Sequence, residues 1–479
     1  MSNSDKSLQF YGGPSLSVFP TVIYLIGSVV MSVCFHFSSM KSLTVSAAIG
    51  ILLGFFFCKN KSIYWDAVVR GLTPFGNARL VITFYLIGIF TTLLTTGKIG
   101  GGFVWMCMNM GIGGYEFVLF VFVACALISM GTCAPIAALF SVVPIFYPPG
   151  ILLGANPDLL AGAMLSGVFF GDALSPCSQL TQVTLFSQHD APDSEPGQLR
   201  ALLKKRYPTV IVVGIISFIL FAWFAHSGTG VAQHSDEVAQ FMSPQGVWML
   251  VPLIALLVIG FYTQNLFLSL NYAIVIGLVV GVLCGTFSWR ELLVIDYKAM
   301  TLRGIFFDGI NSMNDIIIST LLLYGLISLA NEGGCINAFC DWFLRRRFWR
   351  TRWGAEIAVS LGLSITQTAL SGSSLPSILM FNPIAEKLGQ HAKVPAQHRC
   401  WLLLGLSCGM TAIVPVNSCY MMGIVTLIQG MSKHYPWLPE INPFYCFAFT
   451  FYCLLLTLAC VIRLLLDSPL LTRRKVKYS

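Results

Sequence analysis

Four short segments rich in Gly, Ser, Thr and Pro interrupt the apolar stretches of this chain, and they form two pairs. Residues 131–135 (Gly-Thr-Cys-Ala-Pro) and 372–376 (Gly-Ser-Ser-Leu-Pro) each follow an apolar stretch. Each is followed by a second break, at residues 175–179 (Ser-Pro-Cys-Ser-Gln) and 414–418 (Val-Pro-Val-Asn-Ser). The prolines lie 41 residues apart in the first pair (135 to 176) and 39 apart in the second (376 to 415). The matched spacing predicts an internal repeat.

Such segments have a specific chemistry inside a membrane. Proline lacks the amide hydrogen and breaks a helix, which frees backbone amides and carbonyls. Broken backbone survives in a bilayer only where protein or water satisfies it. Helix N-termini then present amides to an anion, and freed carbonyls can coordinate a cation. For one motif a kink or close packing of small residues is the simpler explanation. Four motifs at matched spacing favour a binding site.

Asp172 is the clearest charged candidate. It lies in an apolar stretch, four residues before Pro176. An intramembrane carboxylate is costly unless it is paired, hydrated or protonated, and it marks a functional site by default. It could carry a proton or help to bind a cation, and the alternative is a structural carboxylate that bonds nearby backbone. Weaker candidates, which we expect near the interface, are Asp308, Asp315, Glu332 and Glu356.

The rest of the chain must position these groups within a membrane. Of the 479 residues 56% are hydrophobic and 10% are charged, whereas a soluble domain has about 25% charged residues. The apolar stretches are long enough to cross about 30 Å of hydrocarbon as helices, and the period-2 alternation of a barrel is absent. We predict an all-α polytopic membrane protein of about 11–13 spans, some of them broken or re-entrant. Four shorter apolar runs, at 136–146, 180–186, 377–381 and 421–428, are expected to be arms of the broken helices.

Basic residues predict the orientation. Clusters at 59–79, 200–206, 345–352 and 473–477 are expected on the cytoplasmic side, whereas 227–243 holds two acidic and no basic residues and is expected outside. The first repeat then starts on the cytoplasmic side of the membrane and the second on the outer side, so the repeats are predicted to be inverted.

We predict five regions: N-terminal spans at 1–58, a first inverted repeat at 59–187, a cytoplasmic linker with connecting spans at 188–303, a second inverted repeat at 304–432, and a C-terminal span with a basic tail at 433–479. The clearest linker is 188–198, which is rich in Asp, Pro, Ser and Glu.

The motifs resemble the NhaC sodium/proton antiporter family of the ion transporter superfamily. The residues that carry the resemblance are 171–178 (Gly-Asp-Ala-Leu-Ser-Pro-Cys-Ser), 415–419 (Pro-Val-Asn-Ser-Cys) and the Gly-Ser-Ser of 372–374. The resemblance implies helical hairpins, a site near the midplane at their tips, and elevator-type movement. The site residues it implies are Asp172, Ser175, Ser178, Gly372, Ser373, Ser374, Asn417 and Ser418, to which Thr132 and Gln179 in the same breaks are added.

Two departures bear on the substrate. Gln179 stands where the family has a second acid, and Val416 stands where it has tryptophan. Losing a carboxylate removes a sodium ligand or proton carrier. The first expectation is an ion-coupled secondary transporter of the sodium/proton antiporter type with alternating access. The alternative is a sodium- or proton-coupled carrier of amino acids or organic acids, which a neutral, amide-bearing site would suit.

Other classes fit less well. The basic residues lie in short loops and form no nucleic-acid stripe. The sequence has no zinc-ligand spacing, and Ser178 and Ser373 have no evident base partner, so no enzyme is expected. A channel or receptor is disfavoured by the paired motifs. No cofactor is implied, and no metal beyond transported sodium. The expected partners are the lipid bilayer and a small ion or polar solute, and the sequence leaves a homodimer open. The expected location is a bacterial inner membrane, with the C-terminus cytoplasmic.

Overall fold

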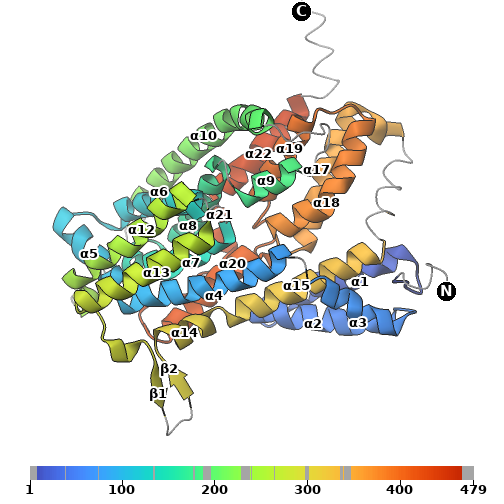
Figure 1. The fold of residues 1–479 in the computed structure, drawn as a ribbon. Coiled ribbons are helices and arrows are strands. Elements are labelled where there is room, and N and C mark those ends of the chain that lie inside the picture. The colour runs from blue at the N-terminus through green and yellow to red at the C-terminus, as the bar shows by residue number, and fades with distance from the viewer. Residues whose placement is uncertain are drawn as a thin grey trace, which may run out of the picture.

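The computed structural model describes residues 8–37, 39–73, 75–132, 135–175, 178–186, 196–227, 238, 240–263, 265–296, 301–334, 338 and 347–466. These residues are almost wholly helical, as the composition predicts, and the helices form one bundle (Figure 1). The protein is therefore a polytopic all-α membrane protein.

The first half of the chain contains ten helices among its described residues. They are α1 (Phe19–Val33), α2 (Met40–Phe56), α3 (Lys61–Arg70), α4 (Phe75–Thr96), α5 (Ile99–Met110), α6 (Gly114–Thr132), α7 (Pro135–Leu152), α8 (Pro157–Leu174), α9 (Gln179–Phe186) and α10 (Pro196–Ser227). A short 3-10 turn, η2 (Pro14–Val18), precedes α1.

The second half continues with a similar series. Its helices are α12 (Leu250–Thr263), α13 (Leu266–Leu283), α14 (Ile305–Ser312), α15 (Asn314–Glu332), α17 (Arg352–Ala369), α18 (Ser374–His391), α19 (Ala396–Gly409), α20 (Cys419–Ser432), α21 (Pro443–Ala448) and α22 (Phe451–Leu466). Its 3-10 turns are η3 (Pro244–Met249), η4 (Trp289–Glu291), η5 (Arg347–Arg350) and η6 (Pro415–Asn417). An antiparallel hairpin of β1 (Val294–Asp296) and β2 (Thr301–Arg303) projects from the bundle (Figure 1), with Val294 paired to Arg303.

Length and apolarity qualify seven helices of the described residues as membrane spans, or eight if the bent pair Val81–Thr96 and Ile99–Met110 counts as one. Four shorter apolar helices have 10–17 residues: Met40–Phe56, Pro244–Gly260, Cys419–Ser432 and Phe451–Leu466. The number that cross the membrane, predicted as 11–13, stays a prediction. So do the five regions and the side on which each basic cluster lies, and the cluster at 473–477 lies outside the described residues.

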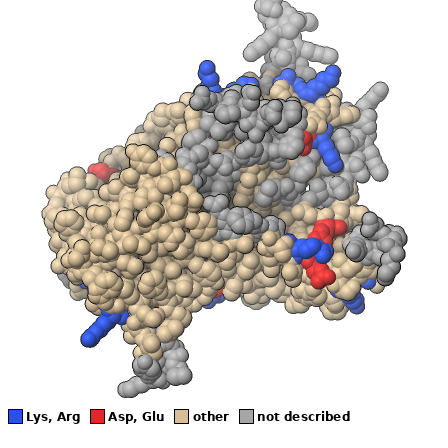
Figure 2. All heavy atoms as spheres, viewed as in Figure 1, with Lys and Arg blue, Asp and Glu red and all other residues tan. Residues whose placement is uncertain are grey.

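Burial separates a central group of helices from a peripheral one. The apolar windows of α7 and α8 are 83% and 78% buried within the protein, whereas that of α10 is 33% buried. Because lipid-facing helices need apolar surface outward, α10 exposes large side chains such as Ile215 and Trp223. The face drawn in Figure 2 is accordingly almost free of charge, and its charged side chains gather in a few places near the edges. The central helices are the ones that contain the breaks.

The order of elements repeats along the chain. A helix pair (α1 and α2, then α12 and α13) is followed by a broken hairpin (α6 and α7, then α17 and α18) and a second broken pair (α8 and α9, then α19 and α20). Contacts between the halves are reciprocal: α15 packs on α2 and α4 on α13, and α20 packs on α7 and α9 on α18. This exchange is what two repeats related by an approximate two-fold axis produce. Inversion of one repeat relative to the other stays a prediction.

Two of the expected short arms are longer than the sequence suggested. The run at 136–146 belongs to α7, which continues through Pro144, Pro148 and Pro149 to Leu152 and is long enough to span by itself. The run at 377–381 belongs to the 18-residue α18. The expectation that these arms cannot cross alone is wrong for α7, because its prolines do not end the helix.

Candidate functional site

The break between α17 and α18 is built from left-handed backbone. Ser371 and Gly372 both have positive φ, at 57° and 67°. A Cβ added at Gly372 would overlap the carbonyl oxygen of Thr411, so only glycine fits this close approach. The Gly372 amide donates to the Gln367 carbonyl oxygen (2.7 Å), and Gln367 Nε2 donates to the Gly372 carbonyl oxygen (3.0 Å). The tip is therefore a tightly hydrogen-bonded turn.

The tip is also bonded to α19 and to the start of α20, on the two sides of the second break of its half. Ser374 Oγ donates to the Ser407 carbonyl oxygen at 2.9 Å, and the Cys419 amide donates to the Ser371 carbonyl oxygen at 2.8 Å. Ser418 caps α20 by accepting from the Met421 amide at 3.3 Å. These bonds satisfy backbone that the breaks would otherwise leave unpaired.

Asn417 connects this half to α1. Its Nδ2 donates to the Thr368 carbonyl oxygen at 2.7 Å, and its Oδ1 accepts from Ser28 Oγ at 2.8 Å. The hydroxyl of Tyr24 on α1 is also hydrogen-bonded to the hydroxyl of Ser371 at the tip. Helix α1, which the sequence assigned no role, therefore holds both breaks of the second half.

In the first half, the end of α8 packs tightly on α6. Gly171 lies so close to the Ala126 carbonyl oxygen that a Cβ there would overlap it. Ser175 Oγ donates to the Met130 carbonyl oxygen at 3.1 Å, two residues before Thr132 ends α6. Ser178 Oγ accepts from the Thr181 amide at 3.4 Å. The predicted site residues Ser175 and Ser178 thus build the turn beside Asp172. The side chains of Thr132 and Gln179 lie outside the described residues.

A cavity of about 40 Å³ lies where the two halves meet. The first turns of four helices line it, and the residues concerned are Pro135 on α7, Leu180 on α9, Leu375 on α18 and Cys419 on α20. Its oxygen-bearing wall is formed by Ser373, Ser319, Thr320, Tyr24, Tyr324 and Tyr420. This volume exceeds the 10–15 Å³ or so that one water needs, so it can hold an ion or a small polar group. None of its described lining residues is charged.

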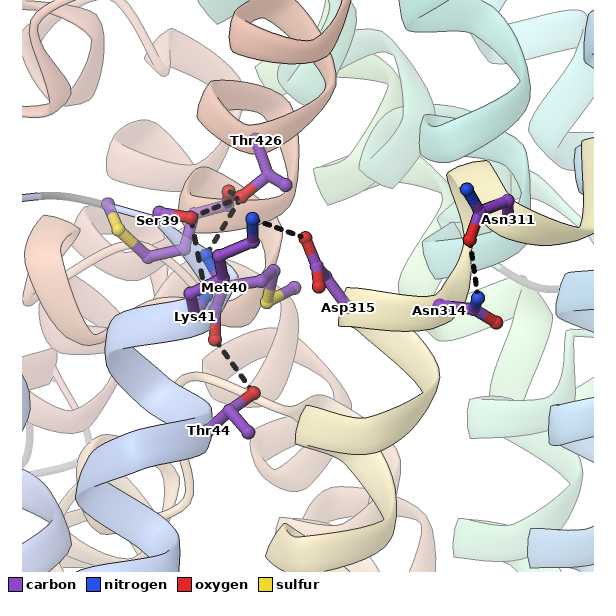
Figure 3. Close-up of polar contacts among 9 residues, drawn as sticks. Ser39, Met40, Lys41, Thr44, Asn311, Asn314, Asp315 and Thr426 are labelled. Carbon is purple, nitrogen blue, oxygen red and sulfur yellow. Dashed lines mark hydrogen bonds and ion pairs between the residues drawn. The ribbon is translucent and has the colours of Figure 1, made fainter. Parts of the chain in front are cut away.

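Polar contacts beside the cavity join three helices (Figure 3). The Met40 amide at the start of α2 donates to Thr426 Oγ1 on α20 at 2.8 Å, and Met40 also lines the cavity. Lys41 Nζ lies 3.7 Å from Asp315 Oδ2 on α15. The Lys41 side chain is exposed and that of Asp315 is partly exposed, so this ion pair contributes little to stability. Together with the Met40–Thr426 bond, it joins the start of α2 to α15 and α20.

The weaker acidic candidates have structural partners. Asp315 pairs with Lys41, and Glu332 accepts from Arg70 Nε at 2.8 Å. Asp308 accepts from the Gly304 amide at 2.9 Å, and Glu356 lies 3.3 Å from both Arg352 Nε and His398 Nε2. These bonds account for four of the five carboxylates.

Asp172 differs from them. Its side chain is fully buried, and neither carboxylate oxygen makes a hydrogen bond of good geometry within the described structure, although the Ser178 hydroxyl lies beside it. It does not line the cavity, but Phe169, one turn earlier on α8, packs edge-on against Tyr420 at 4.9 Å between ring centroids. Tyr420 lines the cavity. Two aromatic side chains, Phe169 and Tyr420, therefore connect the turn of α8 that holds Asp172 to the cavity.

Arg206 has a role that the sequence analysis did not assign to it. The basic cluster at 200–206 was expected to face the cytoplasm, and Lys204 and Lys205 are indeed exposed. Arg206 is only 3% exposed, and its Nη1 donates to Thr181 Oγ1 at 3.0 Å. Consecutive helical residues point about 100° apart, so one long helix cannot place a whole cluster in water. The helical spacing could therefore have indicated that Arg206, the basic residue next to the apolar stretch, is buried.

The structure thus separates the predicted site residues into two groups. Ser373 lines the cavity, while Gly372, Ser374, Asn417 and Ser418 lie behind it and hold the tip. Asp172, Ser175 and Ser178 form a second, charged centre with Arg206. The residues that sequence reasoning missed are Tyr24, Ser28, Ser319, Thr320, Tyr324, Tyr420 and Arg206. All but Tyr420 lie on helices without a break, where the sequence shows no unusual motif.

Two broken helical pairs that meet at a cavity within a polytopic helical bundle are an arrangement typical of secondary transporters. Residues 231–459, just under half of the chain, match the model of the Na+/H+ antiporter family, so the resemblance to sodium/proton antiporters is confirmed there. The fold also shows a distant likeness to the crystal structure of the Alcanivorax borkumensis YdaH transporter, with 14% identity and a TM-score of 0.39. That alignment covers 82% of this chain and 89% of the other. Among curated protein sequences none matches the chain.

Proposed function

We propose that this protein is an ion-coupled secondary transporter of the sodium/proton antiporter type, which exposes the site between its hairpin tips to the two sides of the membrane in turn. The observation that carries the proposal is a cavity lined by residues beside the breaks of both halves, with Pro135 and Leu180 from one and Ser373 and Cys419 from the other. Movement of one half's tip relative to the other would open such a cavity to one side and close it to the other.

In this proposal Asp172 supplies the ion chemistry. A buried carboxylate with two unpartnered oxygens can accept either a proton or a cation, but not both at full strength. Exclusive occupancy of one carboxylate is the simplest basis for exchanging one for the other. The match to the Na+/H+ antiporter family supports sodium as the cation. We place the protein in a bacterial inner membrane, with the basic C-terminal tail in the cytoplasm and no cofactor in the cycle.

One observation favours a second candidate, a sodium- or proton-coupled carrier of amino acids or organic acids. The first turns of α7, α9, α18 and α20 all reach the cavity, and its described lining has no charged residue. Helix N-termini carry partial positive charge and stabilise anions. This arrangement would suit a carboxylate better than a bare cation, and Asp172 would then bind the coupling ion.

Reconstitution into liposomes separates the two candidates. A sodium gradient is imposed across the vesicle membrane, and lumenal pH is followed alongside uptake of labelled amino acids and dicarboxylates. Sodium-driven proton movement without added solute supports antiport and excludes an obligatory solute carrier. Solute uptake that needs sodium, without such proton movement, supports the second candidate and refutes antiport. Protein-free liposomes and the Asp172→Asn variant serve as controls.

A further inference from the structure

Residues 206 and 207 of α10 hold the break that follows Asp172. Arg206 Nη1 donates to Thr181 Oγ1 at 3.0 Å, on the far side of the break. Tyr207 Oη donates to the Leu174 carbonyl oxygen at 3.1 Å, on the near side. Both arms of the broken helix are therefore bonded to neighbouring positions of one outer helix, and Asp172 lies two residues from Leu174.

Arg206 is itself incompletely paired. Its side chain is 3% exposed and its Nη2 makes no hydrogen bond of good geometry within the described structure, although the Cys408 thiol lies beside the guanidinium. The same is true of the Asp172 oxygens, with the Ser178 hydroxyl beside them. The two side chains interact electrostatically. They make no ion pair within 4 Å in the described structure, so the attraction acts across a short gap. A buried guanidinium or carboxylate left without compensation is strongly unfavourable. The described groups that face them from the other packed helices are uncharged: Cys408 on α19, Tyr420 on α20 and Tyr452 on α22.

We propose that Arg206 is the internal counter-charge of Asp172, and that a cation must compete with it for the carboxylate. With Asp172 ionised and empty, the pair is neutral and α10 holds the break. When a cation or proton occupies Asp172, Arg206 is left uncompensated beside it, and its attraction for the break weakens. Arg206 would thus couple ion occupancy at Asp172 to the fit of α10 on the broken helix. This inference rests on the proposed function in taking the competing cation to be sodium.

The first test measures competition. In reconstituted protein Arg206→Gln should lower the sodium concentration for half-maximal transport by about tenfold or more, because an opposite charge near a carboxylate typically shifts its ion equilibria by that much. Arg206→Lys, which keeps the charge, should shift it less. The matched control is Lys205→Gln, which removes the same charge from an exposed neighbouring position and should leave the value unchanged. An unchanged half-saturating concentration in Arg206→Gln would refute the competition.

The second test measures pairing without transport. Thermal unfolding is compared for the wild type, Asp172→Asn, Arg206→Gln and the double variant. If the charges are partners, Arg206→Gln alone should unfold at a lower temperature and adding Asp172→Asn should restore part of the loss. Additive losses would refute the pairing, whatever ion is transported. The two proposals can fail separately. If the wild type moves no sodium but the unfolding temperatures show that Asp172 and Arg206 are coupled, the proposed function is refuted and the pairing of the two charges is supported.

Discussion

Replacing Gly372 with alanine is expected to destabilise the second hairpin tip by about 2–5 kcal/mol. The residue has a φ of 67°, and left-handed backbone costs a residue with a Cβ about 1–2 kcal/mol. The added Cβ would also overlap the Thr411 carbonyl oxygen, which is backbone and cannot rotate away. Overpacking of this kind costs about 1–3 kcal/mol more. The two costs add because they have different origins.

Gly111 provides a matched control. Its φ is 68°, nearly the same, but nothing lies within 4 Å of a Cβ built there. Gly111→Ala should therefore show only the backbone cost of about 1–2 kcal/mol. The difference between the two variants isolates the close approach of the tip to Thr411.

Unfolding of the purified protein in detergent can be followed with a thiol-reactive fluorophore, because Cys408 and Cys453 are buried in the folded protein. Gly372→Ala should unfold at a clearly lower temperature than Gly111→Ala. It should also transport more slowly in liposomes, since neighbouring Ser373 lines the cavity. Equal destabilisation of the two variants would refute the packing of the tip against Thr411.

Three further predictions concern single polar groups. Asp172→Asn should abolish ion or proton coupling while expression stays normal, measured by sodium-driven pH change in liposomes, and unchanged transport would show that the carboxylate is structural. Asn417→Ala should cost about 1–3 kcal/mol by removing buried hydrogen bonds to α1 and α17, whereas Asn314→Ala, whose bond to Asn311 is exposed, should cost almost nothing in the same unfolding assay. Glu332→Gln should cost less than about 1 kcal/mol, and the difference from the wild type should shrink in high salt, because its ion pair with Arg70 is partly exposed; a larger, salt-independent loss would contradict this account.

Much of the fold follows from local sequence. The breaks fall where they were predicted, because proline and left-handed glycine act on the backbone of their own segment. Pro135 begins α7, and Gly372 lies in the turn before α18. Local rules were less reliable within α7, where the sequence predicted a short arm at 136–146 and the helix continues through three prolines to Leu152. A buried helix can continue through proline when its neighbours stabilise it, and that depends on packing rather than on sequence.

The candidate site was only partly predictable. Asp172 stood out as a carboxylate in an apolar stretch, and the paired motifs located the tips. The sequence could not show that Asp172 lies outside the cavity. That position depends on how α8 packs against Tyr420, which lines the cavity. Nor could the sequence assign Tyr24, Ser28 and Ser319, which are ordinary residues of unbroken helices until folding brings α1 and α15 against the breaks.

The sequence by itself determined the membrane setting, the helical class and the positions of the paired breaks, because hydropathy and proline act over a few residues. Only the tertiary structure decided which groups face one another. Arg206 shows the difference most clearly: its neighbours Lys204 and Lys205 are exposed, yet Arg206 is buried and its charge acts on Asp172. Its partner is 34 residues away in sequence, and only the packing of α10 against α8 and α9 brings the two charges together.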